Sequence, residues 1–178
     1  MRPRRVISPG RDLDLLRRLR FFREFTLAEL RRLSRLGGLS TYRDGELLAT
    51  EGTRKQRRIL YVVLRGELHY LKWIRGDHAK VMLSLKPGEI GGFFTFFNDE
   101  PSPVSVQSVG RTRVFEIGRG EFQTLMADHP ALAAKVLLAL VRATVYRLER
   151  FLGRSAATSA WAVDLQHQLQ ALPLTREE

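Results

Sequence analysis

Hydrophobic residues recur at three- and four-residue intervals near the N-terminus. In residues 12–22 and 27–36, leucines at this spacing alternate with arginines, which is the pattern of two amphipathic helices. Thr26 precedes the second helix and Glu29 follows three residues later, which predicts a capping box. Gly37 is expected to end that helix. The chain therefore opens with a pair of helices.

Between residues 39 and 117 the pattern changes to short apolar segments divided by turn residues. Gly66 and Gly110 are interpreted as turn residues between successive strands. Seven short strands at near-regular spacing favour a rolled antiparallel β-structure, and no strand–helix alternation suggests a doubly wound sheet. The predicted strands cover 39–42, 46–50, 59–64, 67–74, 79–85, 104–109 and 112–117.

Helical spacing returns after Gly118. Residues 121–127 predict a short helix, and Pro130 suits the first turn of a longer helix that runs to about Leu152. Gly153 is expected to break this helix before a last amphipathic segment. We therefore expect a basic extension at 1–11, one domain at 12–153 and a short helical tail at 154–178. Within the domain we expect helices at 12–36, a β-roll at 39–117 and C-terminal helices at 118–152.

The long helix carries a heptad-like apolar line. Its members follow a four-three alternation and are Leu137, Val141, Thr144, Leu148 and Phe151. This seam predicts a homodimer in which each long helix meets its counterpart. The alternative is one broad apolar stripe buried within a single copy.

Composition narrows the classes of function. The chain has 178 residues and no cysteine, which excludes disulfides and thiolate metal sites and fits a reducing, cytoplasmic location. We expect no membrane span, because the most apolar run, 131–141, is short and contains Lys135. The four histidines are scattered and no metal-protease or nucleophile-elbow motif occurs. We therefore expect a protein that is not an enzyme and holds no metal.

Positive charge is concentrated in the N-terminal third. Residues 1–60 hold 16 arginines and lysines against 7 acidic residues, whereas the rest holds 14 against 12. Such a surface draws acidic proteins, nucleic acid or anionic lipid, although solubilising arginines give the same count. The expected partner surface comprises Arg17, Arg18, Arg54, Lys55, Arg57 and Arg58. The last four form the cluster RKQRR, which either grips phosphates or decorates a solvated hairpin.

The order of these pieces resembles the cyclic-nucleotide-binding domain superfamily, in the form of a Crp/Fnr-type effector domain. The resemblance runs from about Leu15 to Phe151 and rests on five blocks in order. They are RDGELLATEGT, ILYVVLRGELHYL, LKPGEIGGFFTFFNDEPSPVSV, VFEIGRGEFQTLMADHPALAAKVL and RLERF. The resemblance implies an α+β fold: an antiparallel β-roll, or jelly roll, with N-terminal helices and a long C-terminal helix.

The resemblance also implies a phosphate-binding cassette, from which this sequence departs. The family's Phe-Gly-Glu falls on Ile90, Gly91 and Gly92, so the ribose-binding glutamate is missing. The Pro-Arg pair falls on Pro101 and Ser102, so the phosphate-binding arginine is missing too. What remains for a ligand is Gly91, Gly92, Phe93, Phe94, Ser102 and Ser105. We expect ordinary cyclic nucleotide binding to be lost, while weak binding of another anion stays open.

The phenylalanines of FFTFF, residues 93–97, allow two interpretations. Their rings either plug the vacated pocket or form a face for a base or a partner.

The resemblance also bears on DNA binding. In transcription regulators of this superfamily a winged helix-turn-helix follows the domain. The tail after Ser155 is too short for that domain, so sequence-specific DNA binding by this route is not expected.

Three functions remain open from the sequence. The first is a non-catalytic, stand-alone regulatory domain with a degenerate pocket that acts through protein contacts, with an acidic partner and as a homodimer. The second is a sensor of an atypical nucleotide, such as cyclic di-GMP, or of weakly bound cyclic AMP or cyclic GMP. The third is a nucleic-acid binder without base readout that uses the arginine-rich N-terminal third.

Overall fold

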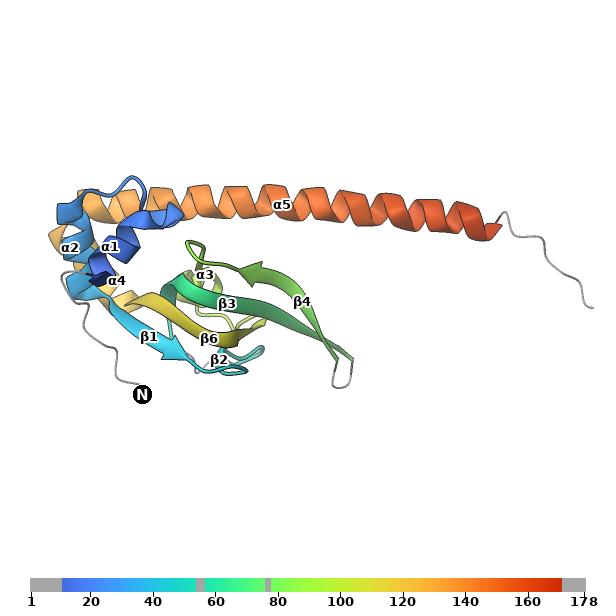
Figure 1. Ribbon diagram of the computed structural model, residues 1–178, viewed down its shortest axis with the longest axis horizontal. Helices are drawn as coiled ribbons and strands as arrows, with labels where there is room; N and C mark the ends of the chain where they lie inside the picture. Colours follow the sequence, from blue (N-terminus) through green and yellow to red (C-terminus); the bar gives the residue numbers. More distant parts are fainter. Residues whose placement is uncertain (1–10, 54–56, 76–77, 171–178) are drawn as a thin grey trace, which may run out of the picture. The chain divides into compact units, whose positions relative to one another are not determined.

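The computed structural model describes residues 11–53, 57–75 and 78–170 and divides the chain into two units, 1–139 and 140–178. The first unit holds the β-sheet, the N-terminal helices and the start of the last helix (Figure 1). The second unit consists of the remainder of that helix and the C-terminal residues. The α+β fold class predicted from the sequence is confirmed.

The N-terminal helices form as their apolar spacing requires. Helix α1 covers Arg11–Arg18, the 3-10 helix η1 covers Arg20–Phe22 and α2 covers Leu27–Leu36. The predicted capping box at α2 is confirmed, since the Thr26 side chain accepts from the Glu29 amide while the Glu29 carboxylate accepts from the Thr26 amide. Glu29 also binds Lys135 Nζ at 2.8 Å, so the cap ties α2 to the beginning of the last helix.

Six strands make one antiparallel sheet. Their bounds are Gly38–Tyr42 (β1), Leu47–Ala49 (β2), Ile59–Arg75 (β3), His78–Leu85 (β4), Ile90–Gly91 (β5) and Ser105–Gly118 (β6). The order is β1-β6-β3-β4, with β2 paired to β6 and β5 paired to β3. The two long strands, β3 and β6, therefore run through the centre of the roll (Figure 1).

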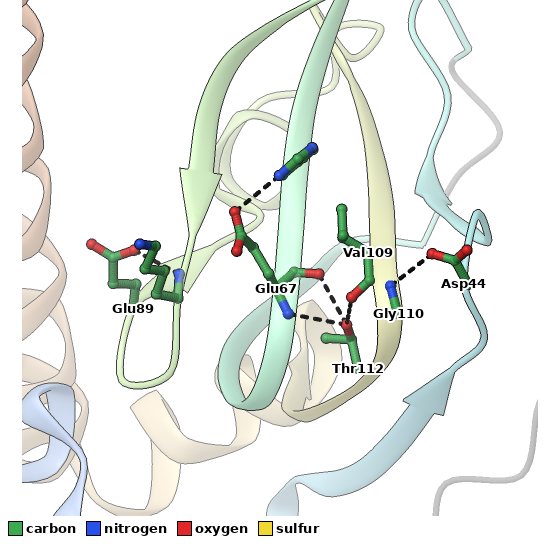
Figure 2. Close-up of polar contacts among 8 residues, drawn as sticks. Asp44, Glu67, Glu89, Val109, Gly110 and Thr112 are labelled. Atoms are coloured by element: carbon green, nitrogen blue, oxygen red, sulfur yellow. Dashed lines mark hydrogen bonds and ion pairs between the residues drawn. The ribbon is translucent and has the colours of Figure 1, made fainter.

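The sequence prediction of seven strands is wrong in three respects: the predicted pair 59–64 and 67–74 is the single strand β3, the pair 104–109 and 112–117 is the single strand β6, and the short strand β5 was not predicted. Gly66 and Gly110 lie inside β3 and β6, with φ of 84° and 63°, and the β3–β6 register shifts beside Gly66. A left-handed glycine inserts a bulge and bends a strand without ending it. Figure 2 shows the polar contacts at this bend: the Thr112 hydroxyl accepts from the Glu67 amide, and Asp44 accepts from the Gly110 amide at 2.7 Å.

Successive side chains of β3 point to opposite faces of the sheet, so the strand contributes to the hydrophobic core on both faces. Ile59, Tyr61 and Val63 are buried in the interior of the roll with Tyr42, Leu68 and Val114. Leu60 and Val62 line a small apolar cavity on the opposite face, together with Phe22, Leu33 and Phe115. The continuous hydrophobic run at 59–63 is therefore a strand segment that is buried on both faces.

Two helices follow the sheet. Helix α4 covers Arg119–Asp128 and α5 covers Pro130–Gln170. The expectation that Gly153 breaks the last helix is wrong, because the α-helix passes through it without interruption. A single glycine costs a helix only about 1 kcal/mol relative to alanine, which the neighbouring helix formers outweigh. Across the described part of the chain, no helix is both long and apolar enough to cross a bilayer.

Candidate ligand pocket

The inward face of the roll ends in a shallow pocket beside α3, which covers Phe93–Phe97. The open space is about 310 Å³ when open solvent is included, but the cavity left for water-sized molecules is about 10 Å³. That is about the room that a single water molecule needs. The lining residues are Leu48, Ala49, Arg57, Ile59, Tyr61, Tyr70, Gly92, Phe94, Thr95, Ser102, Val104 and Val106. Of the six residues predicted for a ligand, Gly92, Phe94 and Ser102 line this pocket.

Gly92 is the residue to which the resemblance assigns the family's ribose-binding glutamate, and its backbone disfavours a side chain there. Its φ is 97°, and a Cβ atom at this residue would lie 2.0 Å from the carbonyl oxygen of Ile59. A left-handed conformation disfavours any residue with a Cβ atom. The Ile59 carbonyl belongs to the paired strand β3, so it cannot move aside freely. The structure therefore has no room for a glutamate at residue 92.

Hydrogen-bonding groups around the loop are used within the protein. The Gly92 amide donates to the Tyr70 hydroxyl at 3.1 Å, and that hydroxyl lies 2.9 Å from the hydroxyl of Tyr61. The Ser102 hydroxyl donates to the carbonyl of Val104 at 2.6 Å. The Ser105 hydroxyl is buried and accepts from the Glu51 amide at 3.0 Å. The Gly92 amide and the hydroxyls of Ser102 and Ser105 are thus bonded within the protein.

The phenylalanines of α3 point in different directions. Phe94 lines the pocket, with its ring centroid 6.5 Å from that of Tyr70, yet it is 45% exposed. Phe96 is buried and packs edge-on against Phe122 of α4 at 5.6 Å. Phe97 is exposed. One ring at most plugs the pocket, and another anchors α3 to the helices.

An arginine stands in the pocket wall where sequence reasoning did not place one. Arg57 was assigned to the basic partner surface, but its side chain is half-buried and pairs with Glu116 of β6. Its Nη1 also donates to the Tyr42 hydroxyl at 3.0 Å, and that hydroxyl donates to Glu116 Oε1 at 2.5 Å. Glu116 is completely buried.

Electrostatics reinforce this group, which we call the Arg57–Glu116–Tyr42 cluster. Burial raises the pKa of the Tyr42 phenol well above its usual value, and the charge of Glu116 raises it further. Burial acts to lower the pKa of Arg57, but hydrogen bonding and charge from Glu116 outweigh it and raise the pKa. Arg57 therefore remains charged while Tyr42 stays a neutral donor.

The other predicted basic residues are dispersed. Arg17 and Arg18 are exposed on α1. Arg58 is exposed and pairs with Asp99 at 2.8 Å, which Arg119 also binds at 2.8 Å. Arg54 and Lys55 lie outside the described residues.

The predicted seam on α5 differs in exposure along its length. Val141, Leu148 and Phe151 are more than half exposed. Leu137 is partly buried, whereas Thr144 is exposed and its hydroxyl donates to the Leu140 carbonyl at 2.9 Å. Val145 and Leu152 are exposed as well, although the sequence analysis did not include them.

No group of three or more potential metal ligands comes together among the residues that the structure describes. His69, which is one of the scattered histidines, bonds to Glu67 at 2.9 Å.

Comparisons with known proteins agree with this architecture. The family model described as cyclic nucleotide-binding domain matches residues 39–129. A search of curated proteins found no match. Among solved structures, a cyclic nucleotide-binding domain from Methylobacillus flagellatus KT is 23% identical, with a TM-score of 0.71 over 82% of this chain and 81% of that one.

Two further solved structures share the fold. The N-terminal domain of a transcriptional regulator from Streptomyces coelicolor A3(2) is 21% identical, with a TM-score of 0.62 over 77% of this chain and 94% of that one. The catabolite activator protein of Thermus thermophilus is 20% identical, with a TM-score of 0.61 over 76% of this chain and 62% of that one. At these identities the solved structures establish the fold alone. The family model matches just over half of the chain and therefore establishes the family. The chain belongs to the cyclic nucleotide-binding domain family.

Proposed function

We propose that this protein is a non-catalytic regulatory domain whose pocket no longer accepts a cyclic nucleotide and which acts through protein contacts. The observation that supports this most is the backbone at Gly92. Its left-handed φ and the Ile59 carbonyl exclude the side chain that would bind a ribose. The remaining space is about 10 Å³, far below the several hundred cubic ångströms that a small-molecule site usually offers.

The missing contacts would contribute a large share of the free energy of nucleotide binding. Each hydrogen bond to a charged group contributes about 1.5 to 3 kcal/mol, and the family's glutamate and arginine contacts are both missing. Together they account for about 3 to 6 kcal/mol, which is roughly a hundredfold to ten-thousandfold in affinity at 1.4 kcal/mol per tenfold. Arg57 does not replace the lost cation, because its guanidinium is already paired with Glu116.

Two surfaces support a role in protein contacts. Exposed arginines of α1, Arg17 and Arg18, offer positive charge to an acidic partner. The exposed apolar side chains of α5 from Val141 to Leu152 recur at the spacing by which two helices pack together. We therefore propose that α5 pairs with its counterpart in a homodimer, and that the arginines serve a second, acidic protein.

A thermal-shift panel tests the closed pocket. Cyclic AMP, cyclic GMP and cyclic di-GMP, each at about 1 mM, should leave the melting temperature unchanged, since a ligand stabilises only in proportion to its binding of the native state. Saturable stabilisation by one of them would favour a nucleotide sensor instead. Binding to random-sequence DNA or RNA at low salt, lost as salt increases, would favour the nucleic-acid binder.

A further inference from the structure

The Arg57–Glu116–Tyr42 cluster places a cation, Arg57, at the pocket wall, and the carboxylate of Glu116 already pairs with that cation. We propose that Glu116 acts as a tethered counter-ion for Arg57 and keeps small anions such as inorganic phosphate from binding at the pocket wall. This inference rests on the proposed function, because it concerns a pocket that holds no nucleotide. It makes Glu116 the residue that determines whether the wall attracts anions.

The position of Arg57 qualifies it as an anion-binding group. Its side chain is 34% exposed and reaches the wall formed by Ala49, Ile59 and Ser102. A guanidinium with apolar neighbours on one side attracts an anion more strongly than one in open water, because the local dielectric is lower. A phosphate can approach from the exposed side, so it does not need to enter the closed part of the pocket.

Glu116 is held where it competes best. The carboxylate is 0% exposed, Oε1 accepts from Tyr42 at 2.5 Å and Oε2 contacts Arg57 Nη2. A buried carboxylate without a cation is costly, so an external anion that displaced it would leave an unfavourable charge behind. A tethered group also acts at an effective concentration of millimolar or more. Free anions at ordinary concentrations therefore lose this competition.

Glu116→Gln separates this role from a structural one. Glutamine keeps the shape of the side chain, and its carbonyl oxygen can still accept from Tyr42. The substitution removes the negative charge and replaces the oxygen that Arg57 Nη2 contacts with an amide nitrogen, so Arg57 stays cationic and loses that acceptor. If Glu116 served only to hold Arg57 and Tyr42 of β1 against β6, the substitution would lower stability without changing the affinity for anions.

The test is titration of the full-length protein with inorganic phosphate and with sulfate, at fixed ionic strength, followed by calorimetry and melting temperature. Wild type should not saturate, whereas Glu116→Gln should bind phosphate at least about tenfold more tightly, which equals about 1.4 kcal/mol. The double variant Glu116→Gln/Arg57→Gln should lose the gain. A folded Glu116→Gln protein that binds no more phosphate than wild type overturns the proposal.

A measurement on wild type covers the case in which Glu116→Gln does not fold. The guanidinium ¹⁵N signals of Arg57 should stay unchanged by phosphate up to about 50 mM, because the tethered carboxylate outcompetes it. Saturable movement of those signals would mean that Glu116 does not block the arginine and would overturn the proposal. Binding of a cyclic nucleotide to wild type would instead contradict the proposed function, so the two failures are distinguishable.

Discussion

Substitution of Gly92 by alanine should destabilise the protein by about 3 kcal/mol. A left-handed backbone costs a residue with a Cβ atom about 1 to 2 kcal/mol, and Gly92 has a φ of 97°. The added Cβ would also lie 2.0 Å from the Ile59 carbonyl oxygen. Forcing extra atoms into a packed site typically costs a further 1 to 3 kcal/mol.

Two other glycines allow these contributions to be measured separately. Gly52 has a φ of 74° and no atom within 4 Å of an added Cβ, so Gly52→Ala reports the backbone cost alone, about 1 kcal/mol. Gly120 lies inside α4 with open space around it. Gly120→Ala should be neutral or stabilising by up to about 1 kcal/mol, because alanine is the better helix former.

Urea unfolding followed by circular dichroism measures the three free energies of unfolding. The order of stability should be Gly120→Ala first, then Gly52→Ala, then Gly92→Ala, with the last two separated by at least about 1 kcal/mol. Equal stability of Gly92→Ala and Gly52→Ala would show that Ile59 does not press on residue 92. A glutamate would then fit at this position, and the reasoning for a closed pocket would fail.

Three further changes test other parts of the structure. Phe96→Ala should cost about 3 to 5 kcal/mol in urea unfolding because its ring is buried, whereas Phe97→Ala should cost less than about 1 kcal/mol; equal losses would refute the two orientations. The hydrogen bond from His69 lowers the pKa of Glu67, so this carboxylate contributes stability above its unfolded pKa that is lost as pH falls through its folded pKa. In Glu67→Gln the free energy of unfolding should therefore fall less steeply than in wild type as the pH drops below about 4.5. The same dependence on pH in both proteins would contradict this prediction. Leu148→Glu should convert the proposed dimer into a monomer in sedimentation, with little loss of monomer stability since the side chain is exposed; an unchanged mass would dispose of the α5 interface.

Local patterns predicted the elements whose signals lie close together in sequence. The capping box needs only Thr26 and Glu29, and the strand predicted at 59–64 needs only its continuous apolar run. Gly66 and Gly110 show the limit of this approach. A glycine with positive φ serves equally well in a turn or a bulge, and the pairing of β3 with β6 decides between them.

The candidate site was predictable in place but not in chemistry. The resemblance to the family assigned the loop to Gly91 and Gly92, and three of the six residues that it gave for a ligand line the pocket. It did not reveal that Tyr70, 22 residues before Gly92, supplies the acceptor for its amide. Nor did it reveal that Arg57 reaches Glu116 across 59 residues of sequence. Such contacts depend on how distant strands meet, and no local pattern encodes them.

The most direct test of the closed pocket follows the Gly92 amide in a ¹H–¹⁵N spectrum while cyclic AMP is added to about 5 mM, a concentration that detects even millimolar binding. This amide donates to Tyr70 at 3.1 Å and belongs to the loop to which the resemblance assigns phosphate binding. The account predicts that its signal does not move. A saturable shift, shared by neighbouring amides of α3, would mean that the nucleotide displaces Tyr70 and that the pocket is still a receptor.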